Sequence, residues 1–563
     1  MASQQRSTRR AFLLDVGAVT GVAASAALAG CGLDQPAPSR DGGRDGGRID
    51  GGSAGGGSAG GGSAHGGGEE TCPPVTECAT SATLPSEWAR EADVVVLGTG
   101  FAGLSAAVAA SDAGAKVLVL EKMAKTEEGG NSVICGNMWW TPTSVDEGVK
   151  YIKALCMGLT DDTCIQTLAQ EMFKLNDWLA TVGVTAGALG VFQPEYPELP
   201  GASSVRTWMN KGGDGLWQPL RDAVAARNVE VLYGSPAVEL IQDPTTREIK
   251  GVVAKNGNQS MNIKCKRGVI LACGGFAFNH AMQAQYLPGW PVFSQGTPGN
   301  TGDGIEMAQK AGAALWHMNN TLAHIGCFVA DPSDPKSLPI SLSLPAASIL
   351  VDKLGSRFMN EKQTDRHGFG HKEHLFFFDG LKQTFSRIPC YAVFDETARK
   401  AGAIAGGLMG WYGKHGGSSW STDNSVEVGK GWIKKGQTLD ALATAIGANA
   451  TTLQATVTRF NGFCSSGQDL DYGRSASTLK ALATAPYYAV PVYPLMYNTQ
   501  GGPRRNEKCQ VITPTGERIP RLYSAGELGS FWGWMYNGGG NAAEAVITGR
   551  LSGKGSAGEA PWA

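Results

Sequence analysis

The chain has 563 residues, 17% of them charged, and a formal net charge of −2 at pH 7. A chain of this length is long enough for more than one domain. Its near-neutral charge gives no global basis for binding nucleic acid or an anionic membrane surface, because such partners attract strongly basic proteins. We therefore expect no nucleic-acid partner, and a small-molecule substrate is expected from the motifs described below.

The N-terminal residues resemble an export signal rather than part of a folded domain. Residues 7–13 read STRRAFL, similar to a twin-arginine signal. The weakly apolar stretch 16–30 is too short to span a bilayer, and it ends in LAGC, similar to the cleavage box of a bacterial lipoprotein. Residues 1–31 are thus predicted to be a twin-arginine lipoprotein-type signal with Cys31 as the lipidated first residue. The alternative is an uncleaved tail or a plain anchor.

Residues 32–89 are predicted to be a disordered tether rich in glycine and serine. The segment contains GGSAGGGSAGGGSA and has too little apolar surface to order itself. We expect an exported protein, periplasmic or at the cell surface, whose membrane contact runs through Cys31 alone.

The twelve cysteines give few further signals. Cys72 and Cys78 flank a Pro-Pro turn and can form a disulfide in an oxidising compartment, although free thiols fit equally well. No two cysteines have C-x-x-C spacing, so we predict no metal, iron–sulfur or haem site. Electrons must then come from, or pass to, a separate partner.

The stretch Ala92–Glu121 organises the rest of the chain. A β-branched run enters the turn Gly98-x-Gly100-x-x-Gly103, and an alanine-rich segment and a second apolar run follow. This is the strand–turn–helix–strand context in which G-x-G-x-x-G predicts dinucleotide binding. The first glycine permits the sharp turn, the second admits a pyrophosphate, and the third brings the helix close to the strand. The helix N-terminus then offers free N–H groups to the phosphates.

The second apolar run ends on Glu121, about 20 residues beyond the turn, where an acceptor for the adenosine ribose hydroxyls belongs. A carboxylate at this place repels a 2′-phosphate, which favours FAD or NAD over NADP. The neighbouring residues Phe101, Ala102 and Lys122 join the predicted cofactor-binding set.

Later glycine turns predict that more backbone surrounds the same cofactor. The segment GGNS follows the first unit, the strand GVILAC runs into a second turn, and LYSAGE precedes GGGNA near the C-terminus. The helix that begins at GGGNA points its N-terminus at an anionic group, for which the flavin N1/C2=O edge is the natural candidate. The further predicted cofactor-binding residues are Gly129, Gly130, Asn131, Ser132, Ala237, Val238, Ala272, Gly274, Gly275, Asp303, Gly526, Glu527, Gly539, Asn541 and Ala542.

The elements between these turns are predicted from their patterns. Residues 144–183 are expected to be helical and 229–238 to form a strand. A helix is expected over 305–311, with Asp303 or Thr301 as its N-cap.

The predicted fold class is α/β, with a Rossmann-like FAD/NAD(P)-binding domain and an inserted α+β capping domain for the substrate. The first part of the binding domain covers residues 90–320 and the second part 491–555. Residues 321–490 lack the strand–helix rhythm and contain most of the histidines, so they form the predicted capping domain.

Together these motifs resemble the flavoprotein family of soluble fumarate reductases, urocanate reductases and 3-ketosteroid dehydrogenases. The matching segments lie between 92 and 550 and include VVVLGTGFAGLSAA, GGNS, LACGGF, NTGDGIEMAQKAGA, RFMNE, LYSAGE and GGGNAAEA. The resemblance implies FAD and hydride exchange between flavin N5 and an activated carbon–carbon bond. In some relatives a histidine near GGNS binds FAD covalently. Asn131 and Ser132 stand there in this chain, so noncovalent FAD is predicted.

The chain departs from the fumarate reductases where they bind a dicarboxylate. Their His-His-Thr-x-Gly-Gly segment is here YNTQGG at 497–502, and Asn537 stands where they carry a clamping arginine. Their Thr-Glu-x-x-Arg relay falls near 341–344, which reads SLSL. Since an arginine fork is not replaced by other side chains, fumarate is predicted to bind poorly.

Five residues are catalytic candidates. By the resemblance, His324 aligns with a substrate-facing histidine, and Arg366 lies within one residue of a proton-donating arginine. His367 is a conventional general acid, and Tyr497 and Tyr536 can polarise a substrate carbonyl. The alternatives are a buried core histidine for His324, an ion-paired surface arginine for Arg366, and ordinary packing for the tyrosines.

Trp139, Trp140, Trp532 and Trp534 flank the glycine turns, either as aromatic walls for a flat apolar substrate or as core residues. We predict an exported FAD-dependent oxidoreductase that acts on a CH–CH or conjugated C=C bond of an apolar enone or acrylate, such as a ketosteroid or aryl acrylate. The alternatives are a lipid-anchored flavin electron carrier without turnover and a fumarate reductase proper.

Overall fold

The computed structural model describes residues 84–562 except 190–193, 212–214, 335–336, 338, 364–365, 368–373, 406–409 and 416–419. The predicted signal, Cys31, most of the predicted tether, and Cys72 and Cys78 lie outside the described residues. The described residues belong to one unit, Ser81–Ala563.

A largely parallel sheet forms the first half of this unit. Its strand order is β21-β22-β9-β1-β2-β6, and β7 and β8 add an antiparallel pair beside β9. The predicted strand–turn–helix–strand unit is confirmed, because β1 and β2 pair in parallel and α1 connects them. The strands are β1 (Arg90–Leu97), β2 (Val117–Leu120), β6 (Glu230–Leu232), β7 (Ala237–Gln242), β8 (Ile249–Asn256), β9 (Gln259–Leu271), β21 (Gln510–Ile512) and β22 (Arg518–Ser524).

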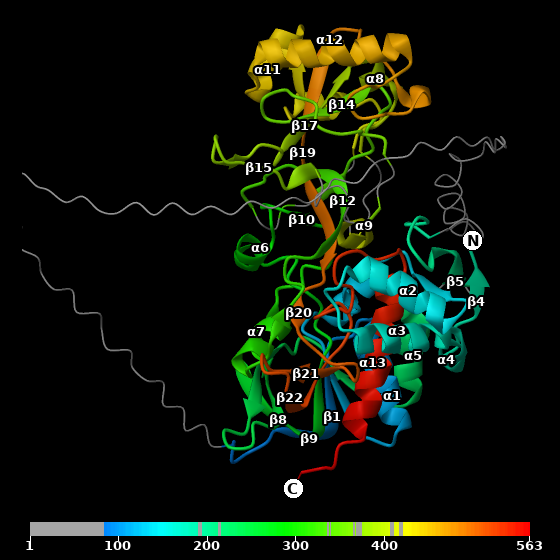
Figure 1. Cartoon of the computed structure of the whole chain (residues 1–563). Helices are drawn as coiled ribbons and strands as arrows, with labels where there is room; N and C mark the ends of the chain where they lie inside the picture. The colour runs from blue at the N-terminus through cyan, green and yellow to red at the C-terminus, as the bar shows by residue number, and fades with distance from the viewer. Residues whose placement is uncertain are drawn as a thin grey trace, which may run out of the picture. The chain divides into compact units, whose positions relative to one another are not determined.

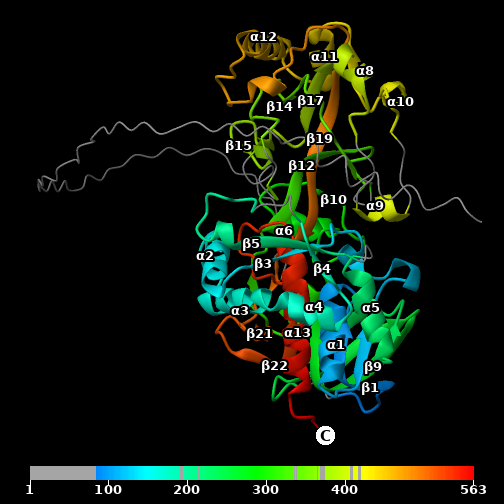
Figure 2. The same cartoon turned by 90° about the vertical axis from the view of Figure 1, so that its right-hand side faces the viewer.

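The apolar run of β1 is buried on both faces, as expected for a parallel strand covered by helices. Helices α1 (Phe101–Asp112) and α13 (Gly540–Ala557), from opposite ends of the sequence, lie side by side over this sheet (Figures 1 and 2). A Cβ atom at Gly549 would lie 2.2 Å from the carbonyl oxygen of Ala102. The two helices therefore approach so closely that no side chain fits between them at this point.

A helical layer and a small sheet complete this half. The predicted helical region 144–183 is confirmed as three helices rather than one. The elements are α2 (Val145–Cys156), α3 (Asp162–Phe173), α4 (Leu175–Thr181), α5 (Trp217–Ala226), α6 (His280–Tyr286), and the antiparallel strands β3 (Met138–Pro142), β5 (Val205–Asn210) and β4 (Ala186–Ala188).

The predicted strand over 229–238 is wrong in its continuity. Strand β6 ends at Leu232, and β7 begins at Ala237 with a different partner. Gly234 has a φ of +60°, and Pro236 has no N–H to donate to a ladder. The chain therefore leaves the edge of the parallel sheet and turns into an antiparallel pair.

The predicted side-chain cap of the helix near residue 305 is also wrong. Helix α7 (Asp303–Lys310) starts two residues earlier than predicted, and its N-cap residue is Gly302, which has no capping side chain. Thr301 Oγ1 and Asp303 Oδ2 each lie 2.7 Å from Lys122 Nζ. Both side chains thus bind a lysine that follows β2 rather than the helix's own amides.

A second, mainly antiparallel sheet forms the other half, with the path β13-β12-β19-β17-β14 and with β10 and β18 beside β19. Strand β19 (Tyr487–Thr499) crosses the predicted boundary at 490/491, so one strand belongs to both predicted domains. The other strands are β10 (Phe293–Ser294), β12 (Thr321–Val329), β13 (Pro339–Ser341), β14 (Ser348–Val351), β17 (Cys390–Asp395) and β18 (Lys434–Gly436). Two further pairs are β11 (Leu315–Trp316) with β20 (Gly502–Pro503), and β15 (Phe378–Asp379) with β16 (Thr384–Phe385).

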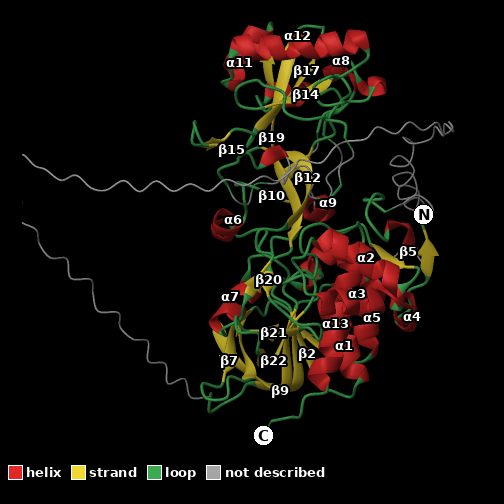
Figure 3. Ribbon diagram, viewed as in Figure 1, coloured by secondary structure: helices red, strands yellow, loops and turns green. Residues whose placement is uncertain are grey.

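Helices α11 (Leu439–Ile446) and α12 (Ala450–Ser466) pack against β14, β17 and β19 (Figure 3). Ile349, Val393, Leu442 and Phe460 belong to the core between them and are fully buried. The remaining helices of this half are α8 (Glu396–Ala401), α9 (Gly410–His415) and α10 (Ser425–Gly429).

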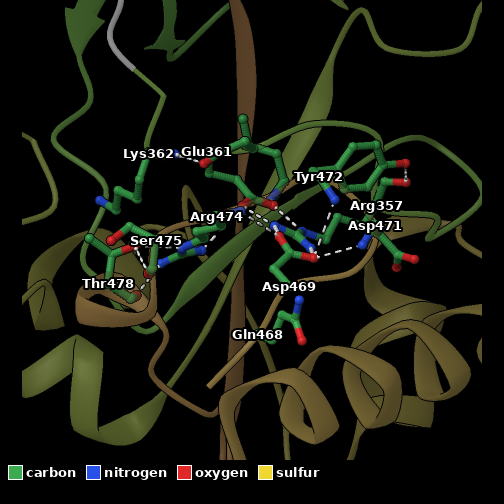
Figure 4. Close-up of polar contacts among 12 residues, drawn as sticks. Arg357, Glu361, Lys362, Gln468, Asp469, Asp471, Tyr472, Arg474, Ser475 and Thr478 are labelled. Carbon is green, nitrogen blue, oxygen red and sulfur yellow. Dashed lines mark hydrogen bonds and ion pairs between the residues drawn. The ribbon is translucent and has the colours of Figure 1, made fainter. Parts of the chain in front are cut away.

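Four charged residues, which we call the capping ion cluster, are buried in this second half (Figure 4). Arg357 donates to both oxygens of Glu361, at 2.7 and 2.9 Å, and to both oxygens of Asp469, at 3.0 and 2.8 Å. Arg474 donates to Glu361 at 3.1 Å and to the carbonyl of Ser348 at 2.8 Å. All four side chains are at most 5% exposed. The cluster ties the RFMNE segment to β14 and to the loop after α12.

Within the part of the chain that the structure describes, no helix combines the length and the apolar character needed to cross a membrane.

Candidate active site

One cavity, of about 390 Å³, lies at the carboxyl ends of the parallel strands. Such edges are where open α/β sheets bind ligands. The cavity is lined by the turns after β1, β2, β9 and β22 and by the N-terminus of α13, so both ends of the folded chain meet around it. The predicted cofactor-binding residues on its wall are Gly98, Gly100, Phe101, Ala102, Glu121, Lys122, Gly130, Asn131, Ser132, Ala237, Ala272, Gly274, Asp303, Gly526, Glu527, Gly539, Asn541 and Ala542.

Four predicted cofactor-binding residues do not line this cavity. Gly103 and Gly129 lie behind the first turn, and Gly275 donates its N–H to Glu527 Oε1 at 2.8 Å. Val238 lines a neighbouring hollow beside Lys122.

The first turn has the geometry that its glycines predict. Gly98 has a φ of +111°, and a Cβ there would lie 2.4 Å from the carbonyl oxygen of Ala272. At Gly103 a Cβ would lie 2.0 Å from the carbonyl oxygen of Gly98, so α1 sits directly on the turn. Just inside the helix, the N–H of Phe101 donates to Ser132 Oγ at 2.8 Å. The GGNS segment, part of a short 3₁₀ helix (Gly130–Val133), thus closes over the helix N-terminus.

Glu121 is buried and held in place from both sides. The N–H groups of Thr99 and Met123 donate to its two oxygens at 3.1 and 2.8 Å. A carboxylate has about four acceptor positions. Glu121 therefore keeps acceptor capacity toward the cavity that it lines.

Glu527 connects three of the cofactor turns. Its carboxyl group accepts from the N–H of Gly275 at 2.8 Å, from Asn300 Nδ2 at 3.1 Å and from Asn131 Nδ2 at 3.2 Å. Burial raises the pKa of Glu527 to about 7. The same group is therefore poised to change charge near neutral pH, in the middle of the cavity wall.

A buried ion pair behind the wall holds two more segments together. Arg505 donates to Glu544 Oε1 at 2.6 Å and to the carbonyl of Gly526 at 3.0 Å, and both side chains are at most 1% exposed. Glu544 Oε1 also accepts from the N–H of Phe531 at 2.6 Å. The pair fixes the turn after β22 and the loop before α13 against each other.

The other end of the cavity is formed by side chains. His367, Tyr497 and Tyr536 all line it. The ring of His367 meets that of Tyr536 edge-on, with centroids 5.0 Å apart, and its centroid lies 6.5 Å from that of Tyr497. Burial raises the pKa of Tyr536 well above its usual value. Tyr536 therefore keeps its phenolic proton throughout the physiological pH range and can act as a hydrogen-bond donor.

A carboxylate lies directly behind His367. Glu195 Oε1 is 2.6 Å from His367 Nδ1, and Glu195 Oε2 accepts from the N–H of Gly538 at 3.0 Å. The backbone N–H of Glu195 donates to Asn537 Oδ1 at 2.8 Å, which also accepts from the hydroxyl of Tyr151 at 2.9 Å. Asn537 is thus buried and engaged in holding the loop of Glu195, and it does not line the cavity.

The remaining catalytic candidates lie elsewhere. Arg366 does not line the cavity: it forms an ion pair with Glu198 and lies over the ring of Tyr196 at 5.2 Å, which matches the surface ion-pair alternative. His324 lies in β12, but its side chain is outside the described residues.

The tryptophans match the core alternative rather than the aromatic-wall alternative. Trp139, Trp140 and Trp532 are fully buried in the core, where the Trp140 ring contacts those of Tyr151 and Trp532. Trp534 is half-buried and does not line the cavity. Large rings adjacent to glycine turns fill the space under the turns, and this packing explains their positions.

A family model described as an FAD binding domain matches residues 93–543. The chain belongs to this FAD-binding family. The fumarate reductase (cytochrome) of Shewanella frigidimarina is 29% identical over 480 residues, which cover 82% of this chain and 76% of the relative. The digoxin reductase of Eggerthella lenta is 28% identical over 524 residues, covering 84% and 89%. The cofactor of the present protein is FAD, and this protein is an FAD-dependent oxidoreductase acting on the CH–CH class of bond.

The fold also matches that of solved relatives. The crystal structure of 3-ketosteroid delta1-dehydrogenase from Sterolibacterium denitrificans superposes with a TM-score of 0.70 at 22% identity, and the match covers 83% of this chain and 99% of that one. The predicted fold class, a Rossmann-like FAD-binding domain with an inserted capping region, is thereby confirmed.

The residues of this cavity fit a dinucleotide. Its walls offer turn amides at helix N-termini for phosphates and carboxylates for hydroxyl groups. Asn541 Oδ1 is buried on this wall and has no hydrogen-bond partner within the described chain. A buried acceptor without a partner is costly, so a bound donor from the ligand satisfies it best.

Sequence reasoning missed Glu195, Asn300, Arg505 and Glu544. Glu544 carried one weak signal, a charge within an otherwise small and apolar segment, whereas Arg505 lies among other charged and polar residues. Glu195 lies in a proline-rich loop, QPEYPELP, and no local pattern links that loop to His367, which is far away in the sequence.

Proposed function

We propose that this protein is an exported oxidoreductase with noncovalent FAD that exchanges a hydride with a conjugated carbon–carbon double bond. We further propose that its substrate is neutral and apolar and carries a carbonyl group, as a ketosteroid or another enone does. The observation that carries this proposal is the side-chain end of the cavity, which combines hydrogen-bond donors and an acid–base group with a carboxylate.

The proposed carbonyl partner is Tyr536, with Tyr497 beside it. A buried phenol that keeps its proton donates to a carbonyl oxygen and draws electron density away from the conjugated double bond. FAD, when bound, supplies the two-electron carrier that gives or takes the hydride. The proposed role of His367 is to give a proton to the neighbouring carbon during reduction, or to accept one during dehydrogenation.

The charges around this end favour a neutral substrate over a carboxylate. Lys122 is the sole lysine or arginine among the described residues that line the cavity, and it is already bound by Thr301 and Asp303. Asn537, in the place of the clamping arginine of fumarate reductases, is occupied with Tyr151 and Glu195. Glu195 balances the charge of a protonated His367, so this pair does not replace the clamping arginine. An enone therefore fits better than fumarate or an aryl acrylate.

The predicted site residues enter the proposal with different roles. Gly98, Gly100, Gly103 and the later glycine turns are proposed to hold FAD, and Glu121 to accept from its ribose. Arg366 is proposed to be an ion-paired residue of the loop rather than the proton donor.

The cellular location is proposed from the N-terminal sequence. The twin-arginine pattern, LAGC and the glycine-rich tether support export and lipidation at Cys31. Electrons then pass to or from a separate donor or acceptor outside the cytoplasm. Cys31→Ser should move the protein from the membrane fraction to the soluble fraction, and retention in the membrane would count against lipidation.

The substrate proposal is tested by reoxidation of the reduced flavin without oxygen. Purified protein is reduced chemically and mixed with 4-androstene-3,17-dione, cyclohex-2-enone, fumarate, urocanate or cinnamate, while absorbance near 450 nm is followed. We expect the neutral enones to restore the oxidised spectrum at least about 100-fold faster than the carboxylates, since one lost charge-assisted pair costs about 3 kcal/mol. Fastest reoxidation by fumarate would identify a fumarate reductase, and no reoxidation by any compound would support an electron carrier.

A further inference from the structure

We propose that Glu195 is a positioning residue that holds His367 with its proton on Nδ1, so that Nε2 is the nitrogen that exchanges the substrate proton. The assignment of Nε2 to the substrate rests on the proposed function. The fixation of the ring by Glu195 rests on the geometry alone.

The contact between the two side chains determines the tautomer. Glu195 Oε1 lies 2.6 Å from His367 Nδ1. An ionised carboxylate is a pure acceptor, so the hydrogen bond requires a proton on Nδ1. In the neutral imidazole the lone pair then resides on Nε2. Without the carboxylate, the proton would be distributed between the two nitrogens.

The carboxylate itself is anchored by the turn that begins α13. The second carboxylate oxygen of Glu195 accepts from the N–H of Gly538 at 3.0 Å, and the backbone N–H of Glu195 donates to Asn537 Oδ1. A Cβ at Gly538 would lie 3.2 Å from both Glu195 Oε1 and His367 Cε1, so the pair lies tightly on this turn. Glu195 thus has one orientation, which it passes on to the imidazole ring.

Glu195 is a charged side chain in direct contact with His367. Glu198 and Arg366 face the same loop but pair with each other. Tyr497 and Tyr536 pack against the ring, and Tyr536 stays neutral because it is buried. Cys135 also lines the cavity as an exposed free thiol, a group that is mostly uncharged at neutral pH. A carboxylate in contact stabilises the charged imidazolium relative to the neutral ring.

The step balances when reduced FAD is the source of the hydride in reduction and oxidised FAD is its acceptor in dehydrogenation. In reduction, the double bond gains a hydride at one carbon and a proton from His367 Nε2 at the other, and the imidazolium becomes neutral. Water then returns the proton to the ring. In dehydrogenation the proton moves from the substrate carbon to Nε2. In both directions Nδ1 keeps its proton, because Glu195 holds it.

The test compares Glu195→Gln with Glu198→Gln in the FAD-loaded protein. Both variants remove one carboxylate from the same loop, but Glu198 contacts Arg366 and not His367. Glu195→Gln is expected to lower kcat at least about tenfold with KM changed less than about threefold, because the ring loses its orientation rather than its substrate. The pH at which reduction falls off should move down by roughly one unit, since the neutral amide no longer favours the imidazolium. Glu198→Gln should match the wild type, and Glu195→Asp should recover part of the loss.

A second readout does not depend on turnover. The chain contains eight histidines, and the ring-nitrogen NMR signals of His367 are identified by their absence in His367→Asn. We expect the neutral ring of His367 to show a protonated Nδ1 in the wild type and an altered tautomer signal in Glu195→Gln. A protonated Nε2 in the wild type, or unchanged kinetics and pH profile in Glu195→Gln, would overturn the role of Glu195. If the wild type turns over no substrate, the proposed function fails, and the ring signals alone decide the role of Glu195.

Discussion

The two ends of the cavity differ in what lines them: backbone turns form one end, and side chains form the other. The end proposed to hold the nucleotide consists of backbone turns, where Gly98 and Gly103 let strands and helices touch. The other end consists of the side chains of Glu195, His367 and Tyr536, which three separate segments bring together. A site formed by the backbone requires glycine at particular positions of the chain, so it can be recognised in the sequence. A site formed by side chains from distant segments has no fixed spacing between its residues in the sequence, so it is recognised only in the folded structure.

The largest expected effect follows from filling the backbone-built end. Gly103→Val places side-chain atoms where a Cβ already lies 2.0 Å from the carbonyl oxygen of Gly98. We expect the purified variant to lack FAD, measured as the loss of absorbance near 450 nm. Gly462→Ala is the control, since Gly462 lies in α12 with nothing within 4 Å of its Cβ position. It should keep its FAD and gain up to about 1 kcal/mol of stability. Normal FAD content in Gly103→Val would contradict the backbone-built description.

The side-chain-built end should respond in the opposite way, with loss of rate and no loss of FAD. His367→Asn removes the proposed acid–base group but keeps a side chain of similar reach. We expect kcat to fall about 100- to 10,000-fold while FAD absorbance stays at the wild-type level. Stopped-flow reoxidation with an accepted enone measures the change. A kcat near that of the wild type would show that a group other than His367 transfers the proton.

The second half of the molecule can be destabilised away from the cavity. Arg474→Met removes one member of the capping ion cluster and leaves Glu361 buried with fewer partners. Such a loss costs about 3–5 kcal/mol, and we expect it to lower Tm while the absorbance of bound FAD is retained. Arg459→Met is the matched control, since its pair with Asp471 is exposed and worth less than about 1 kcal/mol. Equal Tm losses in the two variants would show that the buried cluster contributes no more to stability than an exposed ion pair does.

The smallest expected effect lies where the two ends meet, at Glu527. Because its folded-state pKa is raised to about 7, the folded FAD-free protein binds a proton that the unfolded chain has released. Its stability contribution therefore falls as the pH rises from about 4.5 to 7 and is level above that range. Glu527→Gln mimics the protonated group, so its Tm relative to the wild type should rise by a few degrees between pH 5 and 7.

The control for this effect is Glu517→Gln, which changes an exposed carboxylate. Its Tm should follow the wild type at every pH. Parallel Tm profiles for wild type and Glu527→Gln would show that Glu527 does not bind the extra proton.

Much of the fold followed from local patterns, for physical reasons. Buried runs such as that of β1, followed by a glycine turn and a small-residue helix, have few other ways to satisfy their backbone. The errors arose where tertiary contacts override local rules. Thr301 and Asp303 were expected to cap α7 but bind Lys122, and the strand predicted over 229–238 breaks at Pro236.

The candidate site divides in the same way. Most of the residues expected around FAD line the cavity, because a helix N-terminus and a close approach both require particular residues. Glu195 was not foreseen, since its link to His367 depends on how two distant loops fold. The tryptophans near the turns were ambiguous, because a large ring next to a glycine fits a core and a binding wall equally well.

The close packing of α13 on α1 has a consequence for biosynthesis. The first turn leaves the ribosome well before Gly539, Asn541 and Ala542, which lie at the start of α13. A nascent chain that stops before α13 lacks both this wall of the cradle and the helix that covers α1, so it cannot retain the cofactor. Loading must then wait until α13 has been made, and if the N-terminal signal directs export, loading must be complete before the protein leaves the compartment in which it was translated.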